Sequence, residues 1–131
     1  MNLHSRAEVG PSVIHERLED CFEDMIARTR RGDWSGCDAT WDAFASELER
    51  HMRIAEKRVL PVLPEATVAQ VQADHALIRK TLAELGVLVQ LQGGHEAIAS
   101  GLESLRSAAR QERAVLYSSL RSRVAALQRV A

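Results

Sequence analysis

The spacing of apolar residues constrains this chain more than any other feature. Four long segments carry apolar side chains at helical intervals of three and four residues, and only short breaks separate them. The predicted helices cover residues 12–31, 35–63, 67–92 and 95–128. Short connections place consecutive helices antiparallel. The sequence therefore predicts an all-α, up-down-up-down antiparallel four-helix bundle that forms a single domain over residues 1–131.

Composition supports a helical domain and argues against several classes of partner. Seventeen basic residues against eighteen acidic ones leave a net charge of -1, so no overall field favours nucleic acid or an anionic membrane. Neither a signal peptide nor a membrane-spanning apolar run is visible, and we expect a cytoplasmic protein. Cys21 and Cys37 lack the spacing of a zinc site, so we expect buried or half-buried thiols rather than ligands or a disulfide.

Sequence signals for helix starts precede the second and third segments. Ser35 is followed three residues later by Asp38, and Thr67 is followed three residues later by Gln70. Both pairs resemble capping boxes, in which a hydroxyl and a polar side chain bind the free N–H groups of the first turn. We expect these helices to begin at Ser35 and Thr67.

Four polar residues interrupt the apolar faces, one on each predicted helix. They are His15, His51, His75 and Glu112. Antiparallel neighbours share a turn, so counting residues from that turn gives depth in steps of about 1.5 Å. His15 and His51 lie sixteen residues from the two ends of the first connection, and His75 and Glu112 lie seventeen from the ends of the third. The counts predict one layer of three imidazoles and one carboxylate.

Such a layer suits a metal ion. Buried imidazoles and carboxylates are unfavourable unless a metal ion or a closed hydrogen-bond network compensates for the lost water. Mixed nitrogen and oxygen donors favour Fe, Zn, Mn or Co. The alternative is a metal-free network or a water-filled pocket.

The same residues resemble the hemerythrin-like HHE cation-binding domain, a four-helix bundle. That family has a histidine on the first helix, an HxxxE pair before "LFP" on the second, a histidine on the third and another HxxxE on the fourth. "RVLP" at 58–61 stands in the place of "LFP". The family positions match, in order, His15, His51, His75 and Glu112. The resemblance implies a metal centre, which in the full family site holds two irons bridged by carboxylates and able to bind oxygen.

The chain departs from that family pattern at two positions. Ala55 replaces the bridging glutamate of the second helix, and Ala108 replaces the histidine of the fourth. Arg79, four residues after His75, is not a ligand. What remains is a 3-His/1-Glu group that suits one metal ion with an open coordination position. We expect iron, with Zn and Mn as alternatives and an empty site as the competing prediction.

Other polar residues are expected at the surface. Glu56 would replace the lost carboxylate only if a π-bulge turned it inward, and we expect it to face solvent. Glu19 and Glu47 are expected to be surface charges, with the alternative that they hold an imidazole in one tautomer. His4 and His95 are expected to be surface residues.

Three functional hypotheses follow. The first is a metal-binding protein for O2, NO or peroxide sensing, metal handling or stress protection. No catalytic arrangement is visible, so we expect no conventional enzyme, although an open iron position supports peroxide or NO chemistry. The second hypothesis is a metal-free bundle that acts as an interaction or regulatory module, and the third is a haem-binding bundle. The apolar stretch "LGVLVQL" at 85–91 suggests a face for a homodimer.

Overall fold

The computed structural model describes the backbone of residues 11–130 and the side chains of residues 17–129. In chain order the elements are α2 (Pro11–Arg30), α3 (Trp34–Ile54), the π-helix η1 (Ala55–Val59), the 3-10 helix η2 (Leu60–Val62), α4 (Glu65–Gln90) and α5 (His95–Val130). The described residues contain no strand. The prediction of an all-α chain with four long helices is confirmed.

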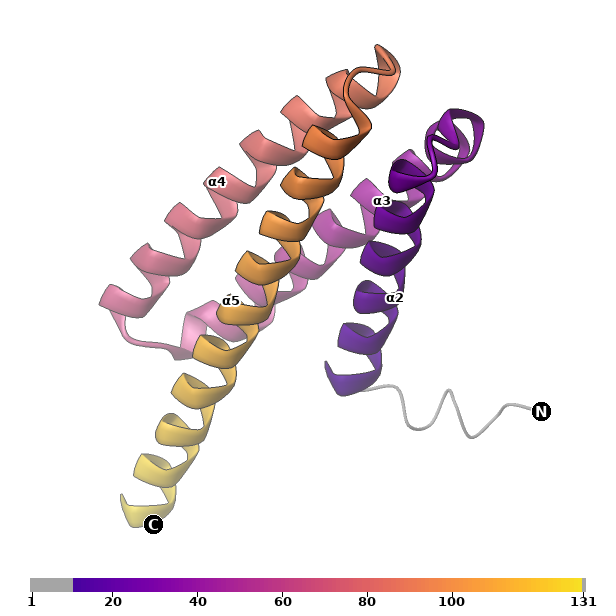
Figure 1. The fold of residues 1–131 in the computed structure, drawn as a ribbon. Helices are drawn as coiled ribbons and strands as arrows, with labels where there is room; N and C mark the ends of the chain where they lie inside the picture. Colours follow the sequence, from indigo (N-terminus) through magenta and orange to yellow (C-terminus); the bar gives the residue numbers. More distant parts are fainter. Residues whose placement is uncertain (1–10, 131) are drawn as a thin grey trace, which may run out of the picture.

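The four long helices lie side by side (Figure 1). Helix α2 contacts α3 and α5, and α4 contacts the same two helices, so each helix has two neighbours. In Figure 1 the chain turns back at each connection, and α5 continues beyond the ends of α2 and α4 toward the C-terminus. None of the described helices combines the length and the apolar character needed to cross a membrane.

A core of apolar side chains fills the space between the four helices. Phe22 of α2 and Phe44 of α3 meet edge to face, with ring centroids 5.0 Å apart. A fully buried side chain of this size contributes about 1.5–3 kcal/mol. Cys37 is buried and Cys21 half-buried, both as free thiols, as predicted. The buried residues of α4 recur at intervals of three and four residues, as the helical spacing predicts: Val71, His75, Ile78, Leu82, Leu85 and Val89.

Neither predicted capping box begins a helix. The side chain of Asp33 accepts a hydrogen bond from the backbone N–H of Gly36, with N and Oδ1 3.0 Å apart, so Asp33 rather than Ser35 caps α3. Asp33 lies earlier in the chain and already reaches the free N–H groups of the first turn. Pro64 has an extended backbone, and helix α4 begins at the next residue, Glu65. The helix therefore begins before Thr67. Both capping predictions were wrong.

The single second helix predicted over residues 35–63 is divided into α3, η1 and η2. The backbone N–H of Leu60 donates to the carbonyl of Ala55, which is the five-residue spacing of a π-helix. Pro61 has no N–H to donate to the carbonyl of Lys57, and its ring clashes with that carbonyl in a regular α-helix. The local widening of the helix changes which side chains face the bundle interior.

Candidate metal centre

His75 is the central residue of the candidate site. Its side chain lies on the inner face of α4 and is fully buried. Its Nδ1 atom lies 2.6 Å from Oε2 of Glu56 in η1. Its Nε2 atom is in hydrogen-bonding contact with Oε1 of Glu112 in α5, a carboxylate that is itself buried. One imidazole therefore joins two carboxylates that come from different helices.

The position of Glu56 corrects a prediction. A side chain next to Ala55 was expected to face solvent because each residue of an α-helix turns the chain by about 100°. In the π-helix the extra residue in the turn brings Glu56 inward, where it contacts His75. Two features of the sequence pointed to this arrangement: Glu56 directly follows the position of the missing carboxylate, and Pro61 disfavours a regular helix there.

The guanidinium of Arg79 contacts the Glu56 carboxylate on its outer side. Its Nη1 atom lies 2.9 Å from Oε2 of Glu56. The same guanidinium donates to both oxygens of Glu49, with Nε–Oε1 at 2.8 Å and Nη2–Oε2 at 2.9 Å. Hydrogen bonding to Arg79 lowers the pKa of Glu49. For Glu56, burial raises the pKa, but hydrogen bonds from Arg79 and His75 outweigh burial and the pKa is lowered. Both carboxylates are therefore held in the charged form.

Two opposing effects act on the pKa of His75. Burial lowers it because the imidazolium loses its hydration, whereas hydrogen bonds to Glu112 and Glu56 and their negative charges raise it. The carboxylates prevail, so the pKa lies above the ordinary value of 6.5. The site therefore favours a positive charge between its two carboxylates.

The other predicted ligands lie on α3 and α2. His51 is half-buried, with a fully buried Nδ1 atom. Burial lowers the pKa of His51, and the negative charges of Glu112 and Glu47 partly offset this effect. The side chain of His15 lies outside the described residues, as does all of His4. The four-member layer therefore stays a prediction, of which the structure brings His75 and Glu112 together.

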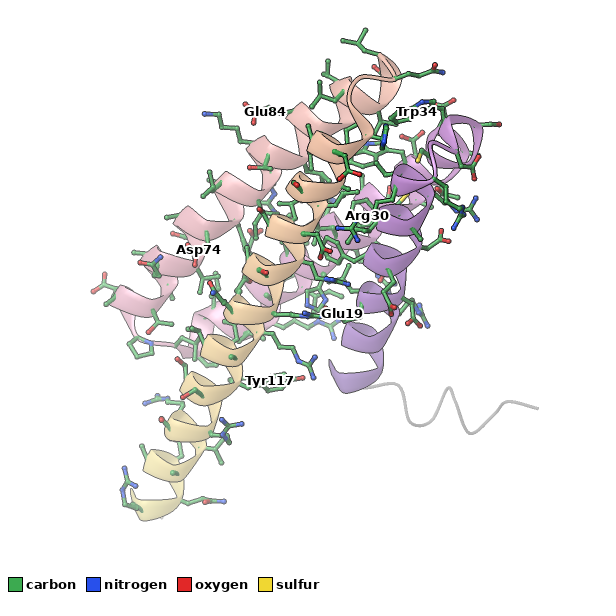
Figure 2. The ribbon with its side chains drawn as sticks, in the orientation of Figure 1. Glu19, Arg30, Trp34, Asp74, Glu84 and Tyr117 are labelled. Atoms are coloured by element: carbon green, nitrogen blue, oxygen red, sulfur yellow. The ribbon has the colours of Figure 1, made fainter. Side chains whose placement is uncertain are left out.

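The remaining polar residues lie largely as expected. Glu19 accepts a hydrogen bond from Arg110, with Oε2 and Nε 2.9 Å apart, and so links α2 to α5 as a partly exposed ion pair (Figure 2). Glu47, four residues before His51, is half-buried and acts on the pKa of that histidine. His95 is exposed, as predicted. None of these three residues enters the contact between the imidazole of His75 and its two carboxylates.

Comparison with known protein families decides the identity of the bundle. The family model described as the hemerythrin HHE cation-binding domain matches residues 13–124. The chain belongs to the hemerythrin HHE family. The match runs from the first turns of α2 into the last turns of α5, so it covers every element that contributes to the site. No curated protein and no solved structure matches the chain.

The potential metal ligands that the structure describes in this hemerythrin HHE domain do not surround one common point. Among the side chains that the structure describes, no three His, Cys, Asp or Glu are grouped as a metal site. The contacts of His75 explain this, because Glu56 and Glu112 approach opposite nitrogens of its ring. Nε2 of His75 and the Glu112 carboxylate can ligate one cation together. Glu56 cannot join them, because it contacts the other ring nitrogen, Nδ1.

The residues present nevertheless fit a single cation. Imidazole and carboxylate donors in a buried pocket suit Fe, Zn or Mn. A carboxylate that accepts the Nδ1 proton of a histidine fixes the tautomer whose Nε2 lone pair binds metal. Glu56 stands in that relation to His75. For a cation, the arrangement would offer Nε2 of His75 and a carboxylate oxygen of Glu112, with Glu56 holding Nδ1 of the imidazole.

Proposed function

We propose that this up-down-up-down bundle binds one metal ion at His75 and Glu112. The observation that carries the proposal is the series of contacts from Glu56 through His75 to Glu112, which favours positive charge at a buried position. His51 and His15 are the further ligands of the proposed 3-His/1-Glu site. Glu56 is assigned a positioning role: it holds Nε2 of His75 toward the cation.

One ion rather than two is expected because, among the side chains that the structure describes, no second carboxylate is available to bridge. Glu56 is engaged by the Nδ1 of His75 and by Arg79, which already supplies a positive charge on its outer side. Ala55 and Ala108 offer no donor atoms in their side chains. Among metals that accept this donor set, family membership favours iron, and Zn and Mn suit the same ligands.

The proposed role is small-ligand sensing, metal handling or protection from oxidative or nitrosative stress in the cytoplasm. A bound iron with an open position would supply binding of O2, NO or peroxide. The chain itself orients the imidazole, keeps Glu56 charged through Arg79 and buries His75 and Glu112 away from bulk water. The homodimer face at 85–91 stays a prediction.

Metal analysis of the purified protein together with its visible spectrum tests the proposal. We expect about one equivalent of metal per chain and no Soret band. A Soret band would favour the haem hypothesis.

A metal-free interaction module is the second candidate. The observation in its favour is that the polar groups of His75, Glu56 and Arg79 are satisfied by one another. A closed network of this kind compensates burial without a cation. Protein that holds less than 0.1 equivalents of metal after incubation with excess Fe2+, Zn2+ and Mn2+ supports this candidate and contradicts the first.

A further inference from the structure

Two grooves approach the candidate centre from different sides. One is lined by Glu56, Glu65 and Arg79 together with apolar residues of η2 and α4, and has a volume of about 580 Å³. The other lies between α4 and α5, has a volume of about 450 Å³, and has Glu112 among its lining residues. Each of the two carboxylates that contact His75 therefore borders one groove.

The two grooves differ in charge. The first groove is lined by two carboxylates, Glu56 and Glu65, and by the Arg79 guanidinium, which lies 2.9 Å from Glu56 and repels an approaching cation. The α4/α5 groove contains Asp74 and Glu112, and no lysine or arginine occurs among the described residues that line it. A cleft lined by one sign of charge raises the local concentration of the opposite ion. Electrostatics therefore favour the α4/α5 groove for a cation.

Residues along the α4/α5 groove are arranged by depth. Asp74, marked on α4 in Figure 2, is half-exposed and accepts a hydrogen bond from the Gln70 side chain, with Nε2 and Oδ1 3.0 Å apart. Glu112 is 8% exposed and contacts His75, so it forms the inner end. Ala108 lies one helical turn before Glu112, is half-buried and lines the same groove. Its small side chain leaves open space beside the carboxylate.

We propose that the α4/α5 groove is the route by which the metal ion reaches and leaves the centre. Asp74 attracts the hydrated cation at the outer end, Ala108 leaves the passage wide enough, and Glu112 receives the cation at the inner end. The inference rests on the proposed function. It gives Ala108 a role other than that of a lost ligand: a larger side chain at this position would obstruct the passage.

Stopped-flow mixing of the metal-free protein with Co2+, followed by visible absorbance, measures the uptake rate. Mixing the cobalt protein with excess chelator measures release. A108L should slow both rates by about tenfold and leave the dissociation constant within about twofold of wild type, because an obstruction raises the barrier equally in both directions. D74N should slow uptake several-fold, more at low salt than at high salt, since it removes steering charge.

The matched control is A114L, which makes the same substitution on an exposed part of α5 outside this groove and should keep wild-type rates. Q72W places a bulky side chain at an exposed position of α4 that lines the other groove, and should leave the rates unchanged. Wild-type rates in both A108L and D74N, or slower uptake and release in Q72W, would overturn the route while leaving the metal site intact. Failure of the wild-type protein to bind cobalt would overturn the proposed function and the route together.

Discussion

At the scale of single residues, the protonation of His75 connects the site to stability. The pKa of His75 is raised above 6.5 in the folded protein because hydrogen bonds to Glu112 and Glu56 outweigh burial. A raised pKa means that the folded state binds this proton more tightly than the unfolded state does. The resulting stabilisation is fully present below the unfolded pKa and is lost as pH rises through the folded pKa.

Metal-free protein should therefore lose stability as pH rises above 6.5, through the raised pKa of His75. Urea denaturation in the presence of a chelator, at a series of pH values, measures this loss. E112Q removes one of the two charges that raise the pKa and should reduce the loss, because glutamine has nearly the same shape but no charge. Stability of the wild-type protein that stays constant or increases over this range would show that the carboxylates do not control His75.

At the scale of elements, η1 decides which carboxylate meets the imidazole. A rotation of 100° per residue correctly places the buried residues of α4, where the helical period is unbroken. The residue count places His75 and Glu112 at one depth because both are measured from one connection. The regular rotation fails for Glu56, because Pro61 and the five-residue hydrogen bond of Leu60 alter the local period. A periodic pattern contains no information about such a local change.

Deletion of Lys57 tests the role of η1. Lys57 is exposed, and its removal places Ala55 and Leu60 four residues apart, which is the hydrogen-bond spacing of an α-helical turn. In that geometry Glu56 points about 140° away from the His51 direction. We expect metal affinity to fall by about 10–100-fold, as it does when the carboxylate that orients a ligating histidine is lost. E56Q should give a loss of similar size, measured by competition with a chromophoric chelator. K57A is the control and should bind like wild type; unchanged affinity in the deletion variant would exclude a positioning role for Glu56.

At the scale of the whole molecule, the bundle brings together groups that are far apart in the sequence. Glu56, His75 and Glu112, which contact one another in series, come from η1, α4 and α5. His51 comes from α3. Family membership, fold class and the proximity of His75 to Glu112 were predictable from spacing and motif. The inward turn of Glu56, its contact with Arg79 and the true caps of α3 and α4 were not, because each depends on competition between local hydrogen bonds.

The most direct test of a one-ion centre at His75 and Glu112 is an anaerobic Fe2+ titration of the metal-free protein, read as equivalents bound at saturation. We predict one equivalent per chain for the wild type and for H95A, whose exposed histidine lies outside the site. E112A and H51A should each lose binding. Two equivalents in the wild type, none at all, or wild-type binding in both E112A and H51A would contradict the assignment.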